Sequence, residues 1–153
     1  MKILDLVTPG GVMDDLRAET KEGVLREMSE AVAAGVPPIS AQALTTILMG
    51  RESLGSTGIG DGVAIPHGKV PGLDRLVAVV GRSRPGVQFQ SLDGKPTHLF
   101  FLVVAPEQSA GMHLKALARI SRLLKDSRFR QSLLDAADAD EFRKILKEED
   151  ERA

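Results

Sequence analysis

An amphipathic pattern near the start of the chain predicts a helix. Apolar residues recur at helical spacing from Val24 to Val32. Thr20 precedes them and suits the N-cap position. The glycine and prolines over residues 35–38 are expected to end this helix.

A second helix is predicted after it, with a cation on its apolar side. Ser40 is the expected N-cap, and Ile39 and Leu44 are placed as a hydrophobic staple. The apolar stripe continues through Leu48, and Arg51 occupies its next position. An arginine there either lies along the apolar surface and complements the helix dipole, or binds an anion. The pattern leaves both interpretations open.

The middle of the chain predicts a shaped loop and apolar strands. Glycines recur over residues 55–62 and lead into a short strand before His67. Residues 76–80 form a second strand candidate. Residues 98–104 form a third, which is apolar on both faces, as expected for a strand covered on both sides. Pro106 is expected to end it.

Helical patterns return in the last third of the chain. We expect a helix over about residues 111–125, a short one around Leu133, and a last one after Asp138, which suits its N-cap. Residues 147–153 are charged and are expected to form a frayed tail. Helices on both sides of apolar strands are typical of an α/β domain.

Length and composition narrow the class of protein. The chain has 153 residues, which suits a single domain over 1–153 with its core at about 4–146. Its 20 basic and 21 acidic residues are mixed along the sequence, so neither nucleic-acid binding nor membrane docking is expected. Cys, Trp and Tyr are absent. This excludes disulfides, thiol nucleophiles and iron–sulfur clusters, and it leaves chemistry to three His, carboxylates, hydroxyls and cations.

The apolar runs predict a cytoplasmic protein without membrane insertion. Asp5 interrupts the position where the apolar part of an export signal would run. The longest apolar stretch, residues 99–105, is much shorter than the roughly 18 residues of a membrane span.

The glycine-rich segment does not match the common nucleotide-binding motifs. Gly62 and Gly68 enclose one residue too many for a P-loop, and Val70 stands where that motif needs Ser or Thr. Val63 stands where a dinucleotide fingerprint needs its third glycine. Two histidines and a carboxylate from distant segments remain a distant hypothesis for a metal site. We expect neither a metal nor another cofactor.

His67 lies in a segment that favours an accessible imidazole. Pro66 fixes the backbone before it, and Gly68 removes side-chain cover after it. Ligands of open α/β sheets bind at such strand ends. The segment fits either a reactive imidazole or an ordinary exposed loop histidine.

The other two histidines lie in regular elements. His113 falls in the first turn of its predicted helix and shares a face with Ile120 and Leu124, so we expect it to point inward. It is either a satisfied core histidine or a neutral ring beside an anion held at the helix N-terminus. His98 opens an apolar strand and is expected to be structural.

Together, His67, His113 and Arg51 suggest phosphoryl chemistry without a thiol. In this hypothesis a neutral imidazole attacks a phosphoryl group in line. A second imidazole and a guanidinium then hold the charge on its oxygens.

Two segments resemble a known family. Residues 54–68 have the sequence Leu-Gly-Ser-Thr-Gly-Ile-Gly-Asp-Gly-Val-Ala-Ile-Pro-His-Gly. They resemble the signature of the type-2 (fructose/mannitol) IIA domains of the bacterial phosphoenolpyruvate phosphotransferase system. Residues 112–124 resemble the second histidine segment of that family. The resemblance extends from Leu4 to about Leu146.

This resemblance implies a mixed, roughly five-stranded sheet flanked by helices, and a phosphotransferase component. It implies that His67 accepts the phosphoryl group through Nε2, as tele-phosphohistidine, and that His113 and Arg51 stabilise it. It further implies that Ser56 and Thr57 line the pocket. The donor would be a phosphocarrier protein of the HPr or NPr type, charged from phosphoenolpyruvate through enzyme I.

Three roles are compatible with this resemblance. Residues 58–69 and 94–101 are most similar to the nitrogen-related branch, which predicts a regulatory phosphocarrier. The alternative within the family is a sugar-specific component that passes the phosphoryl group to a IIB permease domain. An alternative of another class is a binding module, docked on a kinase or transporter and switched by phosphorylation without onward transfer. A flat, apolar donor surface is expected around residues 55–62 and the loop before His113.

Overall fold

Three predicted N-cap residues cap the helices that they precede. The structure, a computed structural model, describes the backbone of residues 1–153 and the side chains of residues 1–109 and 111–153. The side chains of Thr20, Ser40 and Asp138 each accept a backbone N–H from the residue three positions further on. The helices that they begin are α1 (Lys21–Gly35), α2 (Ala41–Glu52) and α5 (Ala139–Arg152).

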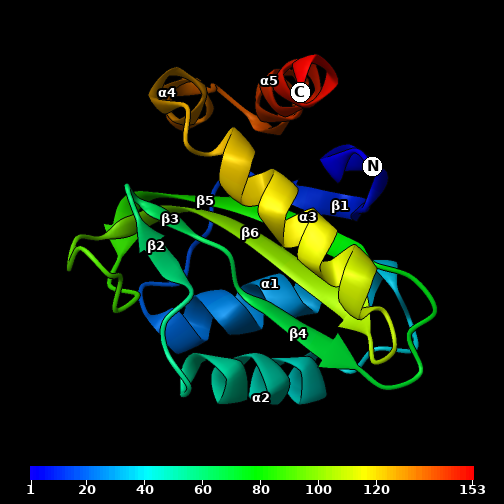
Figure 1. Cartoon of the computed structure of the whole chain (residues 1–153). Helices are drawn as coiled ribbons and strands as arrows, with labels where there is room; N and C mark the ends of the chain where they lie inside the picture. The colour runs from blue at the N-terminus through cyan, green and yellow to red at the C-terminus, as the bar shows by residue number, and fades with distance from the viewer.

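A mixed sheet of six strands lies between layers of helices (Figure 1). The strand order is β1-β5-β6-β3-β2, and β4 pairs with β6 beyond β3. β5 and β6 are antiparallel, whereas β1 is parallel to β5, and β3 and β4 are parallel to β6. The strands are β1 (Val7–Met13), β2 (Gly58–Gly60), β3 (Val63–Ala64), β4 (His67–Val70), β5 (Val77–Val87) and β6 (Thr97–Pro106).

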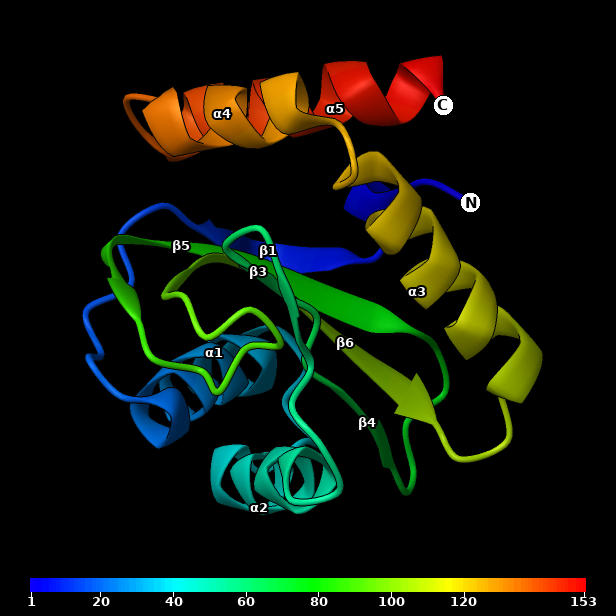
Figure 2. The same cartoon turned by 60° about the vertical axis from the view of Figure 1, so that its left-hand side comes forward.

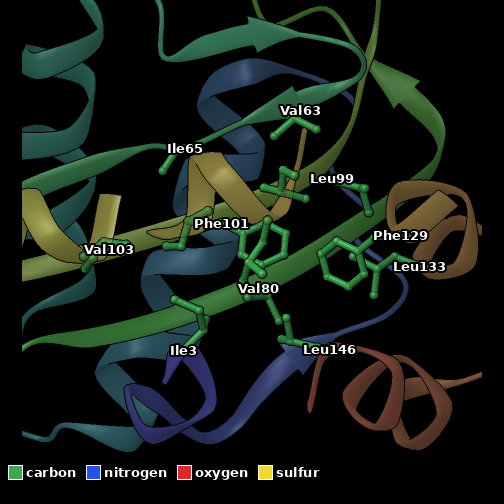
Figure 3. Close-up of a cluster of buried hydrophobic side chains, with 14 of the residues drawn as sticks. Ile3, Val63, Ile65, Val80, Leu99, Phe101, Val103, Phe129, Leu133 and Leu146 are labelled. Atoms are coloured by element: carbon green, nitrogen blue, oxygen red, sulfur yellow. The ribbon is translucent and has the colours of Figure 1, made fainter. Parts of the chain in front are cut away.

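Helices cover both faces of this sheet, as the sequence predicts. α1 and α2 lie on one face and α3 (Ala110–Leu123) on the other, with α4 (Ser127–Asp135) and α5 beyond the end of α3 (Figures 1 and 2). β6 contributes to both cores: Phe101 and Val103 pack on the α3 side, and Leu102 and Val104 pack on the α1–α2 side. Figure 3 shows the first of these clusters, in which Ile65 anchors the chain just before His67.

The first strand, β1, is absent from the sequence prediction. Its residues 8–11 read Thr-Pro-Gly-Gly, a composition typical of a loop. Gly10 has a φ of +73°, and the pairing with β5 shifts register between Val7 and Val12. β1 is an edge strand, where a proline and an irregularity are tolerated because one side of the strand makes no ladder hydrogen bonds.

The expected frayed tail over residues 147–153 is wrong. α5 continues to Arg152, and Asp150 is 2% exposed. Its carboxylate accepts hydrogen bonds from Ile3 N at 2.5 Å and Arg119 Nε at 2.8 Å. These distant partners order the segment, and its charged composition gives no sign of them. They also join α5 to α3 and to the short 3₁₀ helix η1 (Ile3–Asp5).

A buried arginine connects β5 to the C-terminal helices. Arg82 is fully buried, and its guanidinium donates to the carbonyl oxygens of Asp14 at 2.9 Å, Leu133 at 2.8 Å and Ala136 at 2.7 Å. The last two are carbonyls at the C-terminal end of α4, where Leu133 O accepts only a long bond of 3.4 Å from Ala136 N. Arg82 therefore holds α4 against the sheet.

The route of the chain from β3 to β4 positions His67. Both short strands pair with the same strand, β6, and only Ile65 and Pro66 lie between them. Pro66 O accepts a hydrogen bond from Val103 N at 2.9 Å, so this connection is held to the sheet. His67 is the first residue of β4, opposite Val103. Across the described residues, the helices are too short or too polar to span a membrane.

Candidate functional site

The structure brings His67 and His113 together. Their ring centroids lie 5.3 Å apart with an interplanar angle of 75°. His67 begins β4, and His113 lies in the first turn of α3. α3 crosses the face of the sheet opposite to α1 and α2 (Figure 1). The strand end and the helix N-terminus therefore place both imidazoles at one site.

A backbone carbonyl fixes the tautomer of His67. Its Nδ1 lies 2.9 Å from Ile65 O. A carbonyl oxygen can only accept a hydrogen bond, so Nδ1 carries the proton and donates it. The lone pair of the neutral ring is then on Nε2. His67 is half-buried, so its ring is partly accessible.

His113 points inward, as the helical pattern predicts. It is 6% exposed, and within the described part of the chain its Nε2 finds no hydrogen-bond partner. Burial lowers the pKa of His113, and the nearby His67 and Lys69 lower that pKa further. Desolvation is the largest of these causes, and all of them favour the neutral form of the ring.

The N-terminus of α3 keeps its first-turn N–H groups free of a side-chain cap. Ser109 stands at the N-cap position, but its hydroxyl donates to Pro106 O at 2.8 Å. Uncapped N–H groups and the positive end of the helix dipole favour an anion. His113 thus lies where negative charge is stabilised.

Arg51 lies in the last turn of α2, which packs against β4. Ile47, one turn earlier on the same helix face, leaves no room for a side chain at Gly68: a Cβ there would lie 2.9 Å from Ile47 Cγ2. Arg51 is thus on the side of α2 that faces the strand of His67. Its Nη1 donates to Gly55 O at 2.9 Å. Its expected contact with a phosphoryl group stays a prediction.

The hydroxyls of Ser56 and Thr57 are engaged within the glycine-rich loop. Ser56 Oγ donates to Phe89 O at 2.7 Å and accepts from Gly58 N at 3.0 Å. Thr57 Oγ1 donates to a carboxylate oxygen of Glu52. Their expected place in the pocket stays a prediction, and these bonds show that both residues shape the loop.

Glu52 and Lys21 belong to the site's surroundings, although the sequence pattern does not single them out. Glu52 is buried at the end of α2 and pairs with Lys21 Nζ at 2.8 Å. One sequence signal points to it: a carboxylate in the last turn of a helix opposes the helix dipole, so its presence there calls for a partner.

His98, the third histidine, lies in β6. Its Nδ1 is 3.0 Å from Ser83 O on the neighbouring β5 strand, a placement in keeping with the expected structural role. Within the described residues, no group of three or more His, Asp or Glu side chains is arranged to hold a metal ion.

The comparisons with known proteins point to one family. The family model described as "Phosphoenolpyruvate-dependent sugar phosphotransferase system, EIIA 2" matches residues 5–149. A "Nitrogen regulatory protein" of Bradyrhizobium diazoefficiens is 40% identical over 146 residues, which cover 95% of each chain. The "PTS system fructose-specific EIIABC component" of Bacillus subtilis is 37% identical over 98% of this chain, but the match covers 24% of that longer protein.

A solved structure with related sequence has the same fold. The crystal structure of the nitrogen regulatory protein IIA-Ntr from Neisseria meningitidis superimposes with a TM-score of 0.85. Its sequence identity is 31%, and the match covers 93% of this chain and 97% of the other. The likeness therefore extends over most of both chains.

Proposed function

Because this chain belongs to the EIIA 2 family of the phosphoenolpyruvate-dependent sugar phosphotransferase system, we propose that it is a phosphocarrier that accepts a phosphoryl group on His67. The paired histidines are the observation that carries this proposal. His67 offers a lone pair on Nε2 because Nδ1 donates to Ile65 O, and the buried His113 faces it. A nucleophile with a fixed tautomer beside a neutral imidazole suits phosphoryl acceptance.

The proposed step exchanges one nitrogen–phosphorus bond for another. The Nε2 lone pair of His67 forms a bond to phosphorus as the bond from phosphorus to the donor's histidine nitrogen breaks. The donor ring takes back the electron pair of that bond and, with a proton already on its other nitrogen, leaves as a neutral imidazole. The positive charge gained by the His67 ring is offset by the phosphoryl oxygens and by the hydrogen bond from Nδ1 to Ile65 O.

His113 and Arg51 are the proposed stabilisers of the transferred group. The buried Nε2 of His113 gains a partner when it donates to a phosphoryl oxygen, which removes the cost of leaving it unpaired. The guanidinium of Arg51 supplies a second donor from the end of α2. Ser56 and Thr57 line the pocket in this proposal, with their hydroxyls directed into the loop.

The donor is proposed to be a phosphocarrier protein of the HPr or NPr type. Such a protein must bring its own phosphohistidine against His67, and exposed apolar side chains provide a surface for a brief encounter. Met112 and Leu114 flank His113 and are 48% and 67% exposed. Leu54, which follows α2, is 84% exposed, and Ile59 in β2 is 43% exposed. Of these positions, Ile59 lies within the segment over residues 55–62 that is expected to form the donor surface, whereas Leu54, Met112 and Leu114 lie beside the expected segments.

We favour a regulatory role over sugar transport. The support is the likeness to proteins named as nitrogen regulatory over nearly the full length of both chains. The likeness to a fructose-specific protein supports the alternative, in which the phosphoryl group passes on to a IIB domain. The cytoplasmic location expected from the sequence belongs to the same proposal.

Phosphorylation in a reconstituted system tests the proposal. The protein is incubated with phosphoenolpyruvate, enzyme I and an HPr-type protein, and intact mass and acid lability are measured. One acid-labile phosphoryl group is expected on the wild type and on His98→Ala, and none on His67→Ala. Phosphorylation of His67→Ala would refute the assignment.

Adding a IIB domain to the phosphorylated protein separates the two roles. Loss of the phosphoryl group to IIB supports sugar transport. Partner binding that depends on the phosphorylation state, without transfer to IIB, supports regulation. Partner binding that persists unchanged in His67→Ala supports a plain binding module.

A further inference from the structure

A buried carboxylate at the end of α2 holds the start of the glycine-rich loop. The side chain of Glu52 is 3% exposed. Its Oε1 accepts from Thr57 N at 3.0 Å, and its Oε2 accepts from the hydroxyl of Thr57. Lys21 Nζ, from α1, lies 2.8 Å from Oε1 and compensates the charge. Glu52 thus fixes both the backbone and the side chain of Thr57.

Two further hydrogen bonds lead from Thr57 to His67. Thr57 O accepts from Ile65 N at 3.0 Å, which continues the pairing of β2 with β3 by one residue. Ile65 O in turn accepts from His67 Nδ1 at 2.9 Å. The carbonyl that sets the tautomer of His67 therefore belongs to a residue whose own N–H is held by Thr57.

We propose that Glu52, supported by Lys21, is a positioning residue for His67. It holds Thr57, Thr57 holds Ile65, and the Ile65 carbonyl keeps the proton on Nδ1 so that Nε2 stays free. The effect on phosphoryl acceptance rests on the proposed function, whereas the effect on the tautomer does not. Glu52 makes no contact with the phosphoryl group in this scheme.

The first residues of the loop are held by polar anchors because they are exposed and bury little surface. Residues 53–55 are exposed, and Gly55 has a φ of +146°, a conformation that other residues rarely adopt. Arg51 donates to Gly55 O at 2.9 Å, and its neighbour Glu52 accepts from Thr57. The last turn of α2 therefore fixes the loop at two points. The Arg51 guanidinium donates to a backbone carbonyl, and the Glu52 carboxylate accepts from a backbone N–H.

A competing account gives Glu52 a role in stability alone. The side chain of Ile65 is 6% exposed within the core, and Val103 N donates to Pro66 O at 2.9 Å. If these two contacts suffice to place the Ile65 carbonyl, loss of the Glu52 carboxylate will destabilise the protein without changing His67. The experiment must therefore report on the His67 ring itself.

The test compares Glu52→Gln with Asp150→Asn. Asp150 is also a buried carboxylate that accepts a backbone N–H and pairs with an arginine, but it acts on Ile3 and Arg119. The tautomer of His67 is measured from its ring ¹⁵N chemical shifts, and the rate of phosphoryl acceptance is measured with an HPr-type donor. We expect Glu52→Gln to shift part of the His67 population to the Nε2–H tautomer and to slow acceptance by about 10- to 100-fold, the range for a misplaced reacting group. Asp150→Asn should leave both readouts at wild-type values.

A second pair of variants keeps the inference testable if Glu52→Gln fails to fold. Thr57→Val removes the hydroxyl bond to Glu52, and Thr57→Ser retains it. We expect the tautomer shift in the valine variant and its rescue in the serine variant. The inference would be overturned if His67 kept its wild-type tautomer in both Glu52→Gln and Thr57→Val. If Glu52→Gln does not fold, a wild-type tautomer in Thr57→Val alone would overturn it. Because this measurement needs no phosphoryl donor, it decides the inference even if the wild-type protein accepts no phosphoryl group.

Discussion

The imidazole rings of His67 and His113 meet edge to face, with their centroids 5.3 Å apart and their planes at 75°. One ring belongs to β4 and the other to α3, so the contact depends on the folded sheet and its covering helix. The two rings differ in the hydrogen bonds that their nitrogens make. Nδ1 of His67 is bonded to Ile65 O, whereas Nε2 of His113 is buried with no partner in the described part of the chain. The unused nitrogen of His113 leads to the first prediction.

Replacing His113 with alanine should slow phosphoryl acceptance without abolishing it. The loss of one donor to a charged transition state costs roughly 10²- to 10³-fold in rate. The measurement is single-turnover transfer from an HPr-type donor, and His98→Ala serves as the control because His98 bonds to Ser83 O in β5. Unchanged kinetics in His113→Ala would make His113 an ordinary core residue.

The buried His113 should also make stability depend on pH. Burial lowers its pKa in the folded protein, while in the unfolded chain that pKa lies near its ordinary value of about 6.5. Below this pH the unfolded state binds more protons than the folded state, so the free energy of unfolding falls as the pH falls. His113→Gln does not titrate and should show a shallower slope between about pH 7 and pH 5 in urea unfolding. Equal slopes for the two proteins would contradict this prediction.

The exposed apolar side chains should matter for the donor and not for folding. Leu54→Asp places a charge on a side chain that is 84% exposed at the end of α2. We expect the KM for an HPr-type donor to rise about tenfold, which corresponds to a loss of about 1.4 kcal/mol of binding free energy. The kcat and the Tm should change little, because the substituted side chain is on the surface.

Ala43→Asp is the matched control for this variant. It adds the same charge at an exposed position in the first turn of α2, at the other end of the helix. Its KM should stay at the wild-type value. An equal rise in both variants would show that net charge, rather than the proposed donor surface, determines donor binding.

Arg82→Lys should destabilise the protein without affecting the histidine site. Lysine cannot reproduce the planar guanidinium that reaches Asp14 O, Leu133 O and Ala136 O, so buried carbonyls lose their donors. The expected loss is about 3 kcal/mol in the free energy of unfolding, measured by urea denaturation. The ring ¹⁵N shifts of His67 should remain as in the wild type. A loss below about 0.5 kcal/mol, typical of a surface substitution, would contradict the role given to Arg82.

The elements that the sequence predicts well are those determined by local chemistry. Thr20, Ser40 and Asp138 cap their helices because a short polar side chain satisfies free N–H groups within one turn. The inward orientation of His113 follows from helical spacing in the same way. β1 escaped prediction because its partner, β5, lies about seventy residues further along the chain, and its one proline and two glycines suggest a loop.

The residue types of the candidate site could be predicted from the sequence. The residues that hold the site and its surroundings in place could not. Residue types and placement pointed to His67, His113 and Arg51, the family resemblance implied their roles, and the structure brings the two histidines into contact. The roles of Glu52 and Asp150 depend on Lys21 and Arg119, which lie more than thirty residues away from them. A buried carboxylate and a solvated one look the same in a sequence until the partner is known.

The exposure of Leu54 at the end of α2 has an optical consequence. The chain contains no Trp and no Tyr, so it is almost silent in near-ultraviolet fluorescence. Leu54→Trp would introduce a single indole on the proposed donor surface, at a position that is already open to solvent. The emission of that indole would report the approach of a partner in real time, without any label and without background from the rest of this protein.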